Sequence, residues 1–124
     1  MEQSESANDQ SNFKTASELG LRVEAMSDVP DMIGAAFDLD GLILSEADCG
    51  PDFFRLGSGL AGELFQKFVT YRLPVAFVLP DFAAHGERFA ELAFEHSRHS
   101  GVRFVHSQEE ARRWLAGRAG HKRE

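Results

Sequence analysis

Three short apolar runs, separated by segments with helical periodicity, limit this chain to very few folds. The runs cover residues 39–44, 75–79 and 102–106. The first is nearly continuous and broken by Gly41, and the second is continuous, as is typical of strands buried on both faces. The third, which contains Arg103, is expected to be the last short strand. Strands that alternate with amphipathic helices favour an α/β domain with a mostly parallel sheet of four to five strands, joined by right-handed crossovers. Helices are then expected to pack on the sheet.

The N-terminal part of the chain predicts one further strand and a tail. Residues 21–25 alternate apolar and polar side chains, which is typical of a half-exposed strand. Residues 1–17 have only Phe13 as a large apolar group, and we expect a disordered tail because so little apolar surface cannot offset the entropy lost on ordering. The single α/β domain is therefore expected at residues 18–117, followed by a basic tail at 118–124.

Four helices are expected from the apolar periodicity and from residues typical of helix ends. The best of them begins at Ser58, and the last begins at a capping box formed by Ser107 and Glu110. The aromatic residues on these faces, and those of the apolar runs, predict a core rich in phenylalanine. The expected helices cover residues 28–36, 58–71, 86–100 and 107–115.

Composition narrows the class of protein. The chain of 124 residues is long enough for one hydrophobic core, and its 20 acidic against 13 basic residues give a net charge of -7, which disfavours nucleic acid as a partner. A single cysteine, Cys49, is typical of a reducing compartment, and no apolar run is long enough to span a membrane. We therefore expect a cytoplasmic protein with no membrane partner, and we recognise no cofactor motif.

Six segments in the middle of the chain carry a specific pattern, namely Pro51-Asp52-Phe53-Phe54-Arg55-Leu56, Gly59-Leu60-Ala61-Gly62-Glu63, Gln66-Lys67-Phe68, Tyr71-Arg72, Pro80-Asp81-Phe82 and Glu109-Glu110-Ala111. Through these segments the chain resembles, from about Gly41 to Leu115, a bacterial family known as domain of unknown function 4180, or DUF4180. The resemblance implies an α/β fold without a mechanism. This chain departs from the family pattern at Pro80 and His106.

A looser likeness concerns the order of elements, which is similar to that of STAS domains of anti-sigma-factor antagonists. Those domains dock onto partner proteins and are switched by phosphorylation of a serine at a helix start. Ser58-Gly59-Leu60 would occupy the comparable place. The likeness implies a switch at Ser58, whereas the residues alone favour a plain helix cap there.

Ligands of parallel sheets favour the edge formed by the carboxyl ends of the strands, so the candidate surface is placed there. A hydroxyl at a helix start can carry a phosphate that free backbone amides stabilise, and flanking glycines allow close approach. The candidate binding or switch surface consists of Ser58, Gly57, Gly59, Gly62, Glu63, Glu46 and Asp81.

Three functions fit these residues. The leading hypothesis is a non-enzymatic regulatory or protein-binding module that presents the helix start at Ser58. The first alternative is a small-molecule or divalent-metal-dependent enzyme, and the second is a structural homo-oligomer formed through Phe53 and Phe54. The enzyme would use acids at the strand ends, namely Glu46, Asp48, Glu63 and Asp81. A zinc site would need Cys49 with His85, His96, His99 and His106, whose spacing matches no zinc motif, so we expect no metal.

Overall fold

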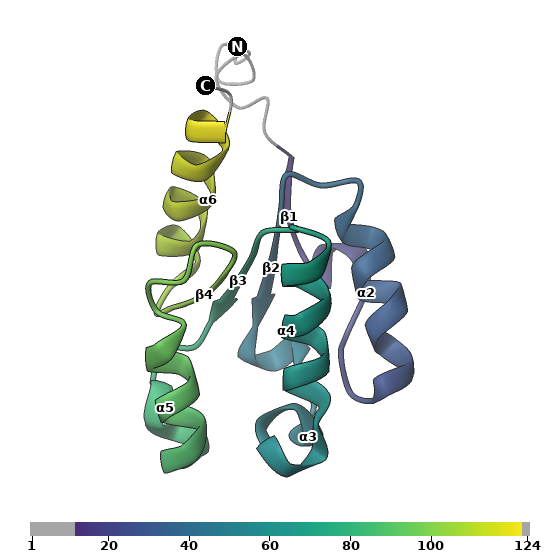
Figure 1. The fold of residues 1–124 in the computed structure, drawn as a ribbon, viewed down its shortest axis with the longest axis vertical. Coiled ribbons are helices and arrows are strands. Elements are labelled where there is room, and N and C mark those ends of the chain that lie inside the picture. Colours follow the sequence, from purple (N-terminus) through teal and green to yellow (C-terminus); the bar gives the residue numbers. More distant parts are fainter. Residues whose placement is uncertain (1–11, 123–124) are drawn as a thin grey trace.

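A four-stranded parallel sheet forms the centre of the molecule (Figure 1). The computed structural model describes residues 12–122 of the chain, with side chains as far as Arg118. The strands lie in the order β1-β2-β3-β4, and every neighbouring pair is parallel, which confirms the predicted α/β class. Their bounds are Phe13–Thr15 for β1, Gly41–Ser45 for β2, Val75–Val78 for β3 and Val102–Val105 for β4.

The strand order equals the chain order, and this determines where the helices lie. Right-handed crossovers that always step in the same direction leave all the connecting helices on one face of the sheet. The connecting helices α2, α4 and α5 share one hydrophobic core with the sheet, while the last helix, α6, packs on the opposite face. Their bounds are Val29–Ala36 for α2, Leu60–Thr70 for α4, Glu87–Glu95 for α5 and Gln108–Lys122 for α6.

The larger core is built from phenylalanine rings, as the sequence predicts. Phe77 of β3 and Phe104 of β4 stack with ring centroids 5.0 Å apart, and Phe53 stacks on Phe77 at 5.4 Å. Phe65 from α4 and Phe89 from α5 close the cluster with edge contacts. Burying one such ring stabilises the fold by about 1.5–3 kcal/mol, so these side chains dominate the packing of helices on the sheet.

Short helical segments make the turns between the main elements. The tight one-turn helix α3 and the 3-10 helix η4 fill the connection from β2 to α4, as the apolar residues there indicate. The helix expected from residue 86 to 100 is shorter than predicted, since α5 ends at Glu95. The short segments are η1 (Ser17–Leu19), η2 (Met26–Asp28), η3 (Glu46–Asp48), α3 (Pro51–Phe54), η4 (Leu56–Ser58) and η5 (Phe82–His85).

The first strand is not where the sequence pattern placed it. Residues 21–25 contain only an isolated parallel bridge between Val23 and Cys49. Val23 is fully buried, so the apolar residue in the middle of this segment reflects the burial of one side chain and not a strand. The strand β1 lies instead at Phe13–Thr15, within the residues assigned to a tail, because its backbone pairs with β2. The remainder of that predicted tail, residues 1–11, lies outside the described residues.

The C-terminal boundary also moves. Helix α6 continues to Lys122 and so includes most of the basic segment that the sequence analysis assigned to a tail. Its apolar side, with Ala111 and Leu115, packs on Ile43, Ala76 and Val105 of the sheet. Within residues 12–122, no helix combines the length and apolar character required to cross a lipid bilayer.

Gly41 allows α6 to approach the sheet closely, so we expect any larger side chain at this position to destabilise the fold. A Cβ added at Gly41 would lie 2.6 Å from Cδ2 of Leu115. We expect Gly41→Ala to lower the free energy of unfolding by about 1–3 kcal/mol through overpacking. In urea unfolding, Gly62→Ala is the matched control: its Cβ meets nothing within 4 Å, so the better helix propensity of alanine should stabilise by about 0.5–1 kcal/mol.

A double variant distinguishes a steric collision with Leu115 from backbone strain at Gly41. Gly41 has no positive φ, so alanine is acceptable to the backbone itself. In the double variant Gly41→Ala, Leu115→Ala the shorter neighbour makes room for the added Cβ. The double variant should therefore lose less free energy of unfolding than the two single variants lose in sum. Additive losses in the double variant would contradict the collision.

His99 predicts a pH-dependent stability at the turn before β4. Its Nδ1 accepts the backbone N–H groups of Gly101 and Val102, both at 3.0 Å. Burial lowers the pKa of His99 below the usual value of 6.5, and the charges of His96 and Arg103 lower it further. The folded state thus holds the neutral ring, and its contribution is complete above about pH 6.5 and is lost as the pH falls below that value.

The measurement compares the wild type with His99→Asn. Asparagine offers an acceptor oxygen near the place of Nδ1 and does not titrate. Between about pH 7.5 and about pH 5.5, the wild type should lose more free energy of unfolding than the variant. An equal loss in the two proteins would assign the pH dependence to other groups.

Candidate functional site

The predicted site residues do not line one common hollow. Glu63 lines a groove between α2 and α4. Gly57 lines a second, smaller groove, and Glu46 is bonded to a residue of that second groove, His85. Ser58 and Gly59 lie in the chain segment between the two. The expectation of a single cleft at the strand ends is therefore corrected.

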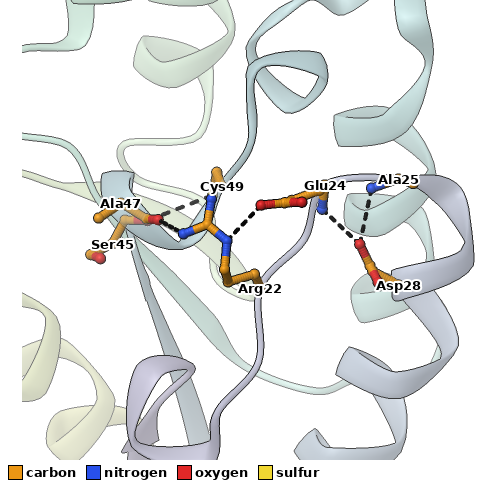
Figure 2. A network of polar contacts seen from close by, with 7 residues as sticks. All are labelled: Arg22, Glu24, Ala25, Asp28, Ser45, Ala47 and Cys49. Carbon is orange, nitrogen blue, oxygen red and sulfur yellow. Dashed lines mark hydrogen bonds and ion pairs between the residues drawn. The ribbon is translucent and has the colours of Figure 1, made fainter.

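A network centred on Arg22 holds together the segments on which both hollows depend (Figure 2). The Arg22 guanidinium donates to Oε2 of Glu24 at 2.6 Å and to the carbonyl of Ala47 at 2.5 Å. Oδ2 of Asp28 accepts the backbone N–H groups of Glu24 and Ala25 at 2.8 and 3.0 Å. The network thus fixes η2, which leads into α2, against η3, which begins with Glu46.

The larger hollow, which we call the α2–α4 groove, has a volume of about 580 Å³. Three large apolar side chains in it are half exposed: Met26 at 48%, Phe37 at 57% and Tyr71 at 49%. Phe37 and Tyr71 meet edge to face, with ring centroids 5.4 Å apart, across the gap between the two helices. The groove is lined by Met26, Val29, Pro30, Ile33, Gly34, Phe37, Glu63, Lys67 and Tyr71.

The α2 side of the α2–α4 groove is acidic. Glu63 and Lys67, one turn apart on α4, form an ion pair of 3.6 Å whose charges compensate one another. No lysine or arginine occurs from residue 23 to residue 54, whereas α2 and its flanks carry the carboxylates of Asp28, Asp31 and Asp38. Because Glu63 turns toward α2, it faces the groove and not the strand-end edge that the sequence analysis considered for it.

Ser58 does not occupy the helix cap predicted for it. It is the last residue of η4, and the cap position of α4 belongs to Gly59, which has φ +81° and so requires glycine. The Ser58 hydroxyl donates to the carbonyl of Asp52 at 2.6 Å and accepts the N–H of Leu60 at 3.2 Å. Ser58 therefore ties α3 to the first turn of α4.

At the strand-end edge, Glu46 and His85 form a close pair. Oε2 of Glu46 lies 2.5 Å from Nε2 of His85, and the imidazole stacks on the ring of Phe54 at a centroid distance of 3.6 Å. Glu46 follows β2 directly, as the sequence predicts. From the sequence, His85 is a zinc candidate and not a partner of Glu46, because 39 residues separate the two and no local pattern joins them.

The other predicted acids have local roles. Asp48 is buried, and its Oδ2 accepts the backbone N–H and the hydroxyl of Ser45 at 2.9 and 3.0 Å. Asp81 is exposed and caps η5 by accepting the N–H of Ala83 at 3.0 Å. Among the described residues, no three histidine, cysteine, aspartate or glutamate side chains gather closely enough to hold a metal ion. The convergence of Glu46, Asp48 and Asp81 considered from the sequence is not found.

Burial corrects the hypothesis of an oligomer formed through Phe53 and Phe54. Phe53 is only 1% exposed and lies in the core, so it offers no surface for oligomer contacts. Phe54 is half-buried and covered by the ring of His85. The glycines of the candidate surface also differ from one another, since an added Cβ at Gly57 or Gly62 meets nothing, whereas one at Gly59 lies 3.6 Å from Cε of Met26.

Cys49 is predicted to be unreactive in the folded protein. Burial raises the pKa of its thiol far above the ordinary value, and the nearby carboxylates of Asp48 and Glu46 add to the rise. At about pH 8 the thiol stays protonated, so we expect reaction with Ellman's reagent to be at least about 100-fold slower than for the unfolded chain. The same protein in denaturant is the control, and equal rates in both states would contradict the prediction.

A comparison with family models finds a match that covers most of the chain. A family model described as "Domain of unknown function (DUF4180)" matches residues 8–115, a span that includes β1 and ends within α6. No curated protein and no solved structure gave a significant match.

Proposed function

The chain belongs to the DUF4180 family, and we propose that it is a protein-binding module whose α2–α4 groove receives a basic amphipathic helix of a partner protein. The observation that carries this proposal is the half exposure of Met26, Phe37 and Tyr71 in one groove. Large apolar side chains gathered at one place on a surface are typical of binding sites, because their contact with water is unfavourable and a bound partner removes that contact.

The shape of the groove favours a helix as the occupant. Its walls are two adjacent helices of 8 and 11 residues, which correspond to about 12 and 16 Å of length at 1.5 Å per residue. A helix of about three turns fits that length. Such a helix presents apolar side chains at positions i, i+3 or i+4 and i+7 on one face, which matches a row of apolar contacts between two parallel walls.

Charge favours a basic partner. The carboxylates of Asp28, Asp31 and Asp38 accompany α2, and the cation of Lys67 is compensated by Glu63. Lysines or arginines beside the apolar face of the partner helix would meet these carboxylates, which speeds association and disfavours acidic partners. The attraction should weaken as salt increases, because surface charges are screened.

The helix start singled out from the sequence lies at one end of this groove. Gly59 approaches Met26, and a Cβ there would be 3.6 Å from its terminal methyl carbon. Ser58, the residue before it, fixes the turn by its bond to Asp52. The predicted switch at Ser58 therefore remains part of the proposal: a phosphate there would disturb the wall of the groove at Met26 and add negative charge.

Peptide binding tests the proposal. The probe is a fluorescent 18-residue peptide of leucine and lysine, with leucine at helical spacing, and the readout is fluorescence anisotropy. We expect Phe37→Ser to weaken binding by about tenfold or more, since it removes a central apolar contact. Phe94→Ser is the matched control, because Phe94 is even more exposed, at 64%, but lies on α5 outside the groove.

Two comparisons make the result decisive. A peptide with glutamate in place of lysine should bind at least about tenfold more weakly, because charge complementarity is reversed. Light scattering of the protein alone shows whether a second copy occupies the groove. Equal affinities of the Phe37 and Phe94 variants, no binding by the wild type, or a dimer that Phe37→Ser dissociates would each overturn the proposal.

A further inference from the structure

The Glu46–His85 pair has the arrangement of a proton-accepting site. A carboxylate only accepts hydrogen bonds, so in the neutral ring the proton sits on Nε2, which faces Glu46 at 2.5 Å. Nδ1 then carries a lone pair. No hydrogen bond to that nitrogen is found among residues 12–118, whose side chains the structure describes. Glu46 thus orients the ring through one nitrogen and leaves the other without a partner in this part of the chain.

Three features hold the imidazole in place. Its face stacks on Phe54 at 3.6 Å with an interplanar angle of 9°. The carboxylate of Glu46 comes from η3, which the Arg22–Ala47 bond fixes to the neighbouring chain. Gly86 follows with φ +102° and ψ 166°, a conformation that only glycine adopts readily, and it turns the chain from η5 into α5. The position of His85 is therefore determined by its surroundings.

A groove of about 260 Å³ lies beside this ring, between η4 and the first turn of α5. Phe54, Leu56 and Phe89 give it an apolar side, and Glu87 and Arg88 are the charged residues that line it besides the His85 ring. Cβ atoms added at Gly57 and Gly86 would meet nothing within 4 Å, so its mouth is open. Its residues are Phe54, Leu56, Gly57, His85, Gly86, Glu87, Arg88 and Phe89.

We infer that this groove binds a small hydroxylated aromatic compound and that His85 accepts the proton of its hydroxyl group. The aromatic part would pack against the apolar side of the groove and the planar guanidinium of Arg88. The hydroxyl would donate to Nδ1, the free acceptor of the oriented ring. This site is separate from the α2–α4 groove, and it does not depend on the proposed protein partner.

The proton transfer is balanced within the groove. The O–H bond of the ligand breaks, its electron pair stays on oxygen, and the proton forms an N–H bond at Nδ1. The resulting imidazolium is stabilised by the Glu46 carboxylate, while the ligand oxyanion is stabilised by the imidazolium, Arg88 and the positive end of α5. His85 is the proton acceptor, and Glu46 is a positioning residue that acts through it.

The probe for this site is 4-nitrophenol, which absorbs visible light only as the phenolate. Binding with proton transfer should lower its apparent pKa by about one unit, equivalent to a tenfold shift of its ionisation. At a fixed pH below its own pKa, adding the wild-type protein should therefore increase the absorbance. The methyl ether 4-nitroanisole, which lacks the hydroxyl, should compete weakly.

Variants assign the effect to the pair. His85→Gln should abolish the rise in absorbance, and Glu46→Gln should reduce the rise more than the binding, because glutamine still accepts from Nε2 but carries no charge. Glu95→Gln, at the far end of α5, and Phe37→Ser, in the α2–α4 groove, should leave the rise unchanged.

The opposite results would overturn the inference. No absorbance change with the folded wild type at millimolar protein excludes it, and so does an unchanged rise in folded His85→Gln, because the effect then arises elsewhere. If that variant does not fold, the ring nitrogen resonances of His85 in the wild type decide the question. They must shift when 4-nitrophenol is added, and constant resonances reject the site.

Discussion

A carboxylate accepts a backbone N–H at the end of three of the four parallel strands, β1, β2 and β4, and so closes the turn that follows each of them. A strand that ends inside a fold leaves backbone N–H groups without ladder partners, and leaving them unbonded is costly. The acceptors are Glu18 for Thr15 at 2.8 Å, Asp48 for Ser45 at 2.9 Å and Glu110 for His106 at 3.0 Å. After β3, Asp81 instead caps η5 by accepting the N–H of Ala83 at 3.0 Å. The strand ends can therefore reverse direction within a few residues.

The segments that follow the strands explain why Glu46 and His85 lie together. The parallel register places the ends of β2 and β3 side by side, so the segments that follow them, η3 and η5, begin at the same edge of the sheet. Glu46 and His85 meet there because Glu46 directly follows β2 and His85 is the last residue of η5, the short helix after β3. The general rule that parallel sheets bring functional groups together at their carboxyl ends thus applies, with a histidine as the second partner.

The sequence predicts most of the fold because most elements carry their own pattern. Strands β2 and β3 lie in largely apolar runs, β4 is apolar except for Arg103, and α4 has an unbroken apolar face, so local composition decides them. β1 has three residues and depends on pairing with β2, which no local pattern reveals. A readable sign existed nevertheless: Thr15 and Glu18 have the spacing of a capping box, the same signal that identified Ser107 and Glu110.

Single side chains of the site were less predictable than the elements, because their partners lie far away in the sequence. Glu46 was identified from its place after a buried strand, but nothing local joins it to His85. Glu63 was assigned to the strand-end edge, whereas the rotation of α4 places it beside Lys67 and opposite α2. Helix rotation depends on which face the core requires, and here Leu64 and Phe68 take the buried side.

The glycine-flanked segment at Ser58 gains its meaning from what lies on either side of it. Leu56 and Gly57 line the groove beside His85, and the positive φ of Gly59 turns the chain so that α4 forms a wall of the other groove. Ser58 holds this turn by bonding both Asp52 and Leu60. One turn therefore separates the groove beside His85 from the α2–α4 groove. The two hydrogen bonds of the Ser58 hydroxyl hold this turn in place.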